Sequence, residues 1–241
     1  MEAGLEEFIG EHPLTRRLTE VFRQVGRLDA PVLLLGEGGT GKRSAARAIH
    51  AASARAGQPF RVAPRESGAG RRLDPDIFLA AAGGTLVIDE VGNTSAEEQE
   101  RLLRVLDEGS VQVVATSRSP LSDQVRSGGF RADLFRRLSE ISITIPALRE
   151  RRSDIPLLVR HFLARHELER GAPVRIDEDA MVVLWEYDWP GNVPELERVL
   201  GELLAKTSRS VVSLESLPPS IRAFRESKRA VPRRVLGPPG S

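Results

Sequence analysis

The chain has 241 residues, of which 40% are hydrophobic and 29% charged, and it contains no cysteine. This composition is typical of a globular protein with a sizeable core, and it excludes a collagen-like fibre, a disulfide-rich mini-protein and any cysteine-based metal site. There are 35 Lys and Arg against 34 Asp and Glu, so no bulk charge draws the chain to nucleic acid or anionic lipid.

The sequence also lacks the features of an exported or membrane-bound protein. It has no apolar run of about 18 residues, and its acidic start contains no apolar signal region. We therefore expect a cytoplasmic protein that does not enter a membrane. The histidines show no spacing typical of metal ligands, and we expect them to pack or to lie on the surface.

Residues 1–147 alternate between short apolar runs and amphipathic segments. We expect helices at 13–27, 44–55, 95–107 and 130–138, and strands at 32–35, 60–62, 85–90, 111–117 and 141–145. A polar loop is expected at 64–75. Strands that alternate with helices predict an α/β domain in which a parallel sheet is sandwiched between helices.

The pattern changes after Pro146. Residues 148–222 show helical periodicity almost throughout, which predicts a small all-α domain. Residues 223–241 are rich in Pro, Gly and Arg, and we expect them to form a disordered basic tail. Such a tail could touch nucleic acid without specificity, although a solvated linker is the favoured interpretation.

The strongest motif is GEGGTGK at residues 36–42, which matches GxxxxGK, follows a predicted strand and opens a predicted helix. In such a loop, backbone N–H groups and the helix N-terminus bind phosphates, and the lysine reaches the β- and γ-phosphates. A glycine-rich turn without function is the alternative, which this context disfavours. The candidate nucleotide-binding residues are Gly36, Gly38, Gly39, Thr40, Gly41, Lys42 and Arg43. The last of these stands where many such loops offer Ser or Thr to Mg²⁺.

A second motif is an apolar strand that ends in Asp89 and Glu90. In nucleoside triphosphatases this pattern places one carboxylate on Mg²⁺ and a second beside the attacking water. We therefore expect Asp89 to be the metal-facing residue and Glu90 to be catalytic. Many ordinary strands end in acids, so the motif gains its weight from the phosphate loop upstream.

The third motif, FRADLFRRL, contains Arg131 and Arg137. An ordinary solvated basic helix is one interpretation. The functional one is a pair of arginine fingers that reach the γ-phosphate in a neighbouring subunit.

Taken with FIGEHPLTRRL, GTLVIDEV, ALRERRSDIPLL and WPGNVPELERVL, these motifs resemble the AAA+ ATPase domain of the bacterial sigma-54-dependent transcriptional activators, over residues 8–222. The resemblance implies an AAA+ α/β domain with a helical lid and a ring, commonly a hexamer, with ATP between subunits. It places Phe8, Ile9 and Gly10 near the adenine, and assigns Arg131 and Arg137 to action in trans. The family usually has Glu at the position of Arg43.

The chain departs from that family at several points. The GAFTGA loop, which touches the sigma factor, is absent, and the segment between LLRVLDEG and VVATS is cut short, so that a second surface loop is missing. Pro64 replaces an Asn thought to hold the catalytic Glu, Ser117 replaces the sensor I Asn, and Pro194 replaces the sensor II Arg. Proline offers no donor to a phosphate.

These features lead to an ATP-binding AAA+ domain, involved in the regulation of transcription, with weak hydrolysis and no direct remodelling of sigma-54. ATP or ADP with Mg²⁺ are the expected ligands, and other copies or other AAA+ activators the expected partners. The alternative is a catalytically weak scaffold that binds nucleotide and acts through other proteins. A domain that keeps only the fold is disfavoured by the intact phosphate loop. We expect no DNA-binding domain, because the 19 residues after 222 are too few for a helix-turn-helix.

Overall fold

The computed structural model describes residues 8–63, 73, 75–170, 173–206 and 211–230. The chain divides into two compact units, Met1–Arg151 and Arg152–Ser241. This division falls a few residues after the domain boundary that the sequence predicts at 147/148.

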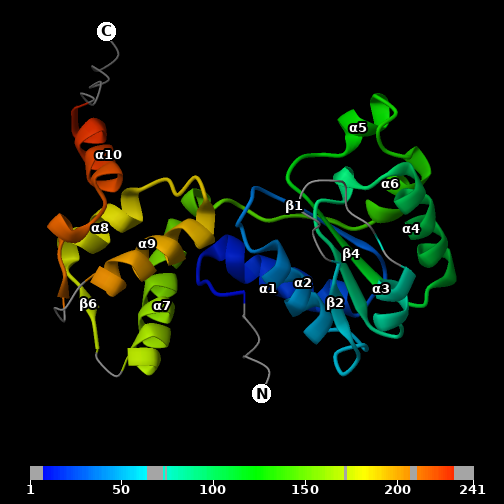
Figure 1. The fold of residues 1–241 in the computed structure, drawn as a ribbon, viewed down its shortest axis with the longest axis horizontal. Coiled ribbons are helices and arrows are strands. Elements are labelled where there is room, and N and C mark those ends of the chain that lie inside the picture. Colours follow the sequence, from blue (N-terminus) through cyan, green and yellow to red (C-terminus); the bar gives the residue numbers. More distant parts are fainter. Residues whose placement is uncertain (1–7, 64–72, 74, 171–172, 207–210, 231–241) are drawn as a thin grey trace, which may run out of the picture. The chain divides into compact units, whose positions relative to one another are not determined.

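Among the described residues, the first unit is built on a five-stranded sheet whose neighbouring strands are all parallel (Figure 1). Side by side, the strands are β2 (Phe60–Val62), β3 (Thr85–Ile88), β4 (Gln112–Ser117), β1 (Val32–Leu35) and β5 (Ser142–Thr144). Each lies in a segment predicted as a strand, because short apolar runs are typical of buried parallel strands. The carboxyl ends meet at one edge, which gathers the segments that follow β1, β3 and β4.

Helices cover both faces of this sheet. They are α1 (Pro13–Gly26), α2 (Lys42–Ala51), α3 (Pro75–Ala80), α4 (Ala96–Glu108), α5 (Ser122–Arg126) and α6 (Ala132–Leu138). Leu34 of β1 packs with α1 and α2, whereas its neighbour Leu33 packs with α4 and α6 on the other face. Side chains alternate along a strand, so one short strand supplies both cores. The predicted sandwich of helices around a parallel sheet is confirmed.

The sequence does not predict α3 or α5, which are six and five residues long and too short to show a helical repeat. Pro75, expected to close a polar loop, instead begins α3. The rest of that loop, apart from the buried Leu73, lies outside the described residues.

The second unit is mainly helical, as predicted. Its helices are α7 (Ile155–Arg170), α8 (Glu178–Glu186), α9 (Asn192–Lys206) and α10 (Pro219–Ala230). It also contains a parallel ladder of two residue pairs between β6 (Arg175–Ile176) and β7 (Val211–Val212). Strands this short leave no periodic pattern that the sequence could have revealed.

The WPGN turn between α8 and α9 is part of the core of this unit. Trp189 is fully buried, and its indole N–H donates to the Leu184 carbonyl at 2.8 Å. Trp189 and Asn192 both adopt positive φ angles, of 48° and 54°. Pro194 lies in the first turn of α9, where a missing N–H leaves no helical hydrogen bond unmade.

The disordered tail predicted from residue 223 is wrong for residues 223–230, which continue α10. The helix starts at a proline, its Ile221 is buried, and the ring of Phe224 lies 5.0 Å from that of Tyr187. The composition of residues 223–241, which is rich in Pro, Gly and Arg, does not reveal these apolar contacts. Residues 231–241 lie outside the described residues.

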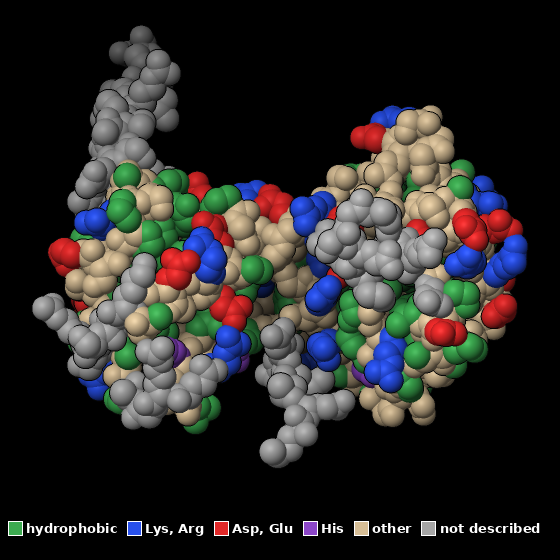
Figure 2. Space-filling model, viewed as in Figure 1, with side chains coloured by type: hydrophobic (Ala, Val, Ile, Leu, Met, Phe, Trp, Pro, Cys, Tyr) green, Lys and Arg blue, Asp and Glu red, His purple; other side chains and the backbone are tan. Residues whose placement is uncertain are grey.

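Basic and acidic side chains are interspersed over the face seen in Figure 2, in keeping with the net charge of +1. Within the described residues, no helix is long and apolar enough to cross a membrane.

Candidate nucleotide-binding site

The loop between β1 and α2 has the backbone shape that its glycines allow. Gly36, Gly39 and Gly41 have φ angles of 147°, 79° and 99°, which residues with a Cβ rarely adopt. A Cβ on Gly36 would lie 2.6 Å from the carbonyl oxygen of Ile145. The loop therefore wraps closely over the end of the sheet, and Gly41 caps the N-terminus of α2.

Lys42, the first residue of α2, folds back over this loop. Its Nζ donates to the carbonyl oxygens of Gly36 at 2.6 Å and Glu37 at 3.0 Å, and lies 3.9 Å from Oε1 of Glu90. The residue is only 8% exposed. Thr40 is buried, and its hydroxyl donates to Glu37 O at 3.0 Å, which closes the turn. The ammonium group of Lys42 is thus held between the start of the phosphate loop and Glu90.

The acidic pair follows β3 at the same edge of the sheet. Thr116 of the neighbouring β4 links both residues: its hydroxyl donates to Asp89 Oδ1 at 3.3 Å and accepts the backbone N–H of Glu90 at 3.0 Å. Glu90 has a φ of 52°, an uncommon conformation for a residue with a side chain. Backbone strain at such a position is typical of functional sites.

Arg43 forms an ion pair with Asp89. Its Nε lies 2.7 Å and its Nη2 2.5 Å from Oδ2 of the carboxylate. The Arg43 side chain is 60% exposed, whereas that of Asp89 is 13% exposed. The residue expected to face a metal therefore has a guanidinium against one oxygen and the Thr116 hydroxyl on the other.

Glu90 is engaged by Arg118, which follows β4. The Arg118 backbone N–H donates to Oε2 at 3.2 Å and its Nε to Oε1 at 3.3 Å. The preceding residue, Ser117, does not face the acids: its hydroxyl donates to Ser119 O at 2.6 Å. Its carbonyl accepts the Gly36 N–H at 3.2 Å, so it supports the start of the phosphate loop.

The N-terminal segment lies against the same loop. A Cβ on Gly41 would come within 3.1 Å of the Phe8 ring, and the guanidinium of Arg151 lies 5.1 Å from the centre of that ring. Arg151 is buried and donates to Thr40 O at 2.7 Å. Ile9 and Gly10, which follow Phe8 directly, are half-buried.

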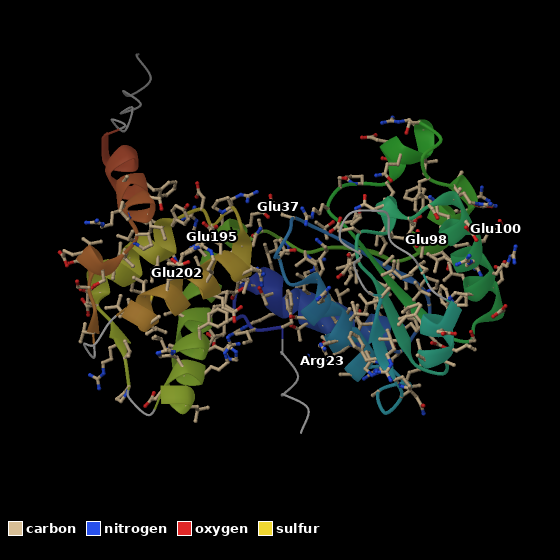
Figure 3. The ribbon with its side chains drawn as sticks, viewed as in Figure 1. Arg23, Glu37, Glu98, Glu100, Glu195 and Glu202 are labelled. Atoms are coloured by element: carbon tan, nitrogen blue, oxygen red, sulfur yellow. The ribbon has the colours of Figure 1, made fainter. Side chains whose placement is uncertain are left out.

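A second arginine from the ALRERR segment reaches the loop. Arg149 donates from Nη1 and Nη2 to the two carboxylate oxygens of Glu37, at 2.9 and 2.5 Å. Glu37, labelled in Figure 3, lies in the loop after β1. This two-point pairing ties the phosphate loop to the short 3-10 turn Leu148–Glu150.

The structure does not bring the candidate arginine fingers to the phosphate loop of their own chain. Arg131 pairs with Asp133 at 2.7 Å, and Arg137 with Asp107 and Glu140 at 3.3 and 3.4 Å. In the described part of the chain, their ion-pair partners lie on α4, on α6 or in the turn after α6. Both side chains are about two-fifths exposed, as residues that reach another subunit would have to be.

Sequence motifs locate the loop and the two acids, which meet at the carboxyl edge of the sheet. They miss Thr116, Arg118 and Arg149, which hold Asp89, Glu90 and Glu37. The sequence position of Arg118 could have predicted its place in the site, because residues after β4 must lie at the same sheet edge as those after β1 and β3.

Two family models match the chain. One, described as the sigma-54 interaction domain, matches residues 9–148, and the other, the AAA+ ATPase lid domain, matches residues 149–233. The chain belongs to the sigma-54 interaction domain family. The predicted AAA+ fold with a helical lid is thereby confirmed.

Curated relatives are regulators of transcription. The chain is 35% identical to a Nif-specific regulatory protein of Enterobacter agglomerans, across 87% of this chain and 46% of the relative. It is 39% identical to the DNA-binding transcriptional regulator NtrC of Azospirillum brasilense, across 86% of this chain and 50% of the relative. The chain spans about half the length of these relatives.

Solved structures show the same fold. The crystal structure of NtrX from Brucella abortus in complex with ATP superimposes with a TM-score of 0.82 at 30% identity, over 94% of this chain and 56% of that one. The complex of NtrX with ADP gives a TM-score of 0.81 at 29% identity.

Proposed function

We propose that the chain binds ATP or ADP through residues 36–43. The observation that carries the proposal is the loop between β1 and α2, with three glycines at positive φ and Lys42 at its mouth. Backbone N–H groups and the N-terminus of α2 are suited to phosphates, and Lys42 would exchange its two carbonyl contacts for phosphate oxygens. The similar NtrX structures, solved in complex with ADP and with ATP, support the same ligand.

The base of the nucleotide would lie beside the N-terminal segment. Phe8 contacts Gly41, at the start of α2, so Ile9 and Gly10 are close to the end of the phosphate loop. An apolar, half-buried segment there suits an adenine ring, which is flat and mostly apolar.

Hydrolysis, where it occurs, would use Glu90 to polarise water and Arg131 and Arg137 to neutralise charge on the phosphoryl group from a neighbouring subunit. We expect this hydrolysis to be slow. Arg118 engages the Glu90 carboxylate, and the Ser117 hydroxyl bonds to its own turn, not to the site. An active site between subunits requires self-association into a ring, or assembly with other AAA+ activators.

Magnesium is the part of the expected ligand set that this geometry does not accommodate. Asp89 is paired with Arg43, and no hydroxyl stands at position 43. Among the described residues, no group of three or more His, Asp or Glu side chains is arranged to hold a metal ion. A metal that arrives with the nucleotide would find Asp89 already neutralised.

In the cell, the chain would act in the regulation of transcription, as its relatives do. We do not expect it to remodel sigma-54 by itself, because the interval between β2 and β3 contains no GAFTGA sequence. Without that loop, motion driven by ATP has no known point of contact with the sigma factor.

A second function is favoured by the pairing of both carboxylates with arginines. If Asp89 and Glu90 stay engaged when ATP binds, the chain is a nucleotide-dependent scaffold that acts through other proteins. Both functions require nucleotide binding, so they are distinguished by whether the chain hydrolyses ATP.

The test is to measure binding, turnover and molar mass on one sample. Calorimetry with ATP and ADP should show one site per chain, and light scattering should show larger assemblies with nucleotide. Slow turnover that rises with protein concentration supports the ATPase, and binding without turnover supports the scaffold. Absence of binding would contradict both.

A further inference from the structure

We infer that Arg43 takes the place of a metal ion at Asp89, so that nucleotide affinity at this site depends little on Mg²⁺. The inference rests on the proposed nucleotide binding and concerns what balances the charge of the site.

In many P-loop nucleotide sites, the protein holds Mg²⁺ through two groups: a Ser or Thr hydroxyl directly after the lysine, and a carboxylate at the end of another strand of the same sheet. Here the first position is Arg43, which is a donor with no acceptor oxygen. The second is Asp89, the residue with which Arg43 pairs. Arg43 thus supplies no ligand at the first position and occupies the carboxylate at the second.

The geometry of the pair resembles what a cation would achieve. Two guanidinium nitrogens lie 2.7 and 2.5 Å from Asp89 Oδ2, and the Thr116 hydroxyl donates to Oδ1 at 3.3 Å. Both carboxylate oxygens are therefore engaged, and the side chain is only 13% exposed. Mg²⁺ sheds its water reluctantly and would have to displace a charged, two-point contact to reach this carboxylate.

The charges around the two acids agree. Lys42 and Arg118 face Glu90, at 3.9 and 3.3 Å, while Arg43 faces Asp89. Three cations thus accompany two carboxylates without any metal. This surplus favours a polyphosphate in its metal-free, more negative form.

The decisive experiment compares Arg43→Ser, which restores the hydroxyl of other P-loops, with Arg47→Ser as a matched control. Arg47 is one turn further along α2, is exposed, and its guanidinium lies 4.7 Å from the ring centre of Phe60. Both substitutions remove one positive charge from the same helix. The affinity for ATP is measured by calorimetry on the full chain, with EDTA and with millimolar Mg²⁺.

For the wild type and for Arg47→Ser, we expect the affinity for ATP in EDTA and the affinity in Mg²⁺ to agree within about threefold. For Arg43→Ser, we expect Mg²⁺ to strengthen binding by about tenfold or more, roughly the effect of one regained charge-assisted contact. A wild-type affinity that rises with Mg²⁺ as steeply as that of Arg43→Ser would overturn the inference.

A second measurement tests the pair without nucleotide. Urea unfolding in EDTA of wild type, Arg43→Ser, Asp89→Asn and the double variant gives the coupling between the two side chains. We expect Arg43→Ser to destabilise the wild type and to have no effect on Asp89→Asn. Zero coupling overturns the inference even if no nucleotide binds. Absence of binding in every condition would instead overturn the proposed function.

Discussion

Arg118 contacts both carboxylate oxygens of Glu90, with its backbone N–H 3.2 Å from Oε2 and its Nε 3.3 Å from Oε1. The two residues follow adjacent parallel strands, β4 and β3, whose register brings Ala115 beside Ile88. The proposed general base is therefore held by a residue from the adjacent strand, and a carboxylate whose two oxygens already accept hydrogen bonds is less free to turn toward the attacking water.

Arg118→Ala should raise the rate of ATP hydrolysis per subunit by roughly twofold to fivefold. A rate change of this size corresponds to the free energy that an exposed ion pair contributes. Because Arg118 is one of the three cations around the two acids, its loss should also weaken ATP binding, which saturating ATP compensates. Steady-state turnover at saturating ATP measures the effect.

Arg126→Ala is the matched control, since Arg126 forms an exposed ion pair with Asp123 within α5. It should leave turnover unchanged. A lower rate in Arg118→Ala would mean that Arg118 assists the reaction and does not restrain Glu90.

Arg131→Ala and Arg137→Ala should each lower turnover without a matching loss of ATP affinity. A fully engaged arginine finger contributes about 10³ to 10⁵ in rate, and we expect a smaller ratio here because the site is weakly organised. Turnover should also rise with protein concentration in the wild type.

Arg136→Ala provides the control on the same helix, because Arg136 is exposed and lies between the two candidates. Equal rates for all three variants, at a turnover independent of concentration, would remove the proposal that arginines act in trans.

Acid stability should depend on Asp133. The hydrogen bond from Arg131 lowers the pKa of Asp133 from 3.8 to about 2. A carboxyl with a lowered folded pKa stabilises the fold above its unfolded pKa, and this stabilisation is lost as the pH falls from about 4 to about 2.

Asp133→Asn should therefore flatten the pH dependence of unfolding in that interval, as measured by urea denaturation at each pH. In an Arg131→Ala background the same substitution should have a much smaller effect. If the Arg131→Ala background leaves the effect of Asp133→Asn unchanged, the pairing is not its cause.

The stability of the second unit should depend on Trp189 far more than on Trp185. Trp189 is fully buried and Trp185 is 44% exposed. Trp189→Ala should cost about 3–5 kcal/mol of stability, because it leaves a large cavity. Trp185→Ala should cost less than about 1 kcal/mol, typical of a surface substitution. Similar costs in chemical denaturation of the full chain would contradict the burial seen here.

The sequence predicted the sheet because each strand is a short apolar run, such as Val32–Leu35, between polar turns. It also located the phosphate loop and the two acids, since each motif is continuous along the chain. It missed α3 and α5 because helices of five or six residues show no period. It mistook 223–230 for a tail because Ile221 lies before the segment whose composition was judged, and Phe224 is a single aromatic residue within that segment.

The pairs that define the site could not be predicted in the same way. Arg43 and Asp89 are 46 positions apart, and Arg118 and Glu90 are 28 apart. Strand order places these residues at one edge of the sheet, but only the side-chain directions decide which cation meets which carboxylate. The sequence predicts that Asp89 faces magnesium and that Arg43 stands where many P-loops have a magnesium-binding hydroxyl, and the pairing of these two residues changes what the metal assignment of Asp89 means.

The central claim is that the loop after β1 binds nucleotide through Lys42. Calorimetric titration of ATP into the wild type, Lys42→Ala and Arg47→Ala tests it most directly. Each variant removes one positive charge from α2, and of these two side chains it is Lys42 that contacts the phosphate loop. We predict that Lys42→Ala weakens binding by about tenfold or more, while Arg47→Ala binds as the wild type does. Equal affinities in all three proteins, or no binding by the wild type, would contradict the account.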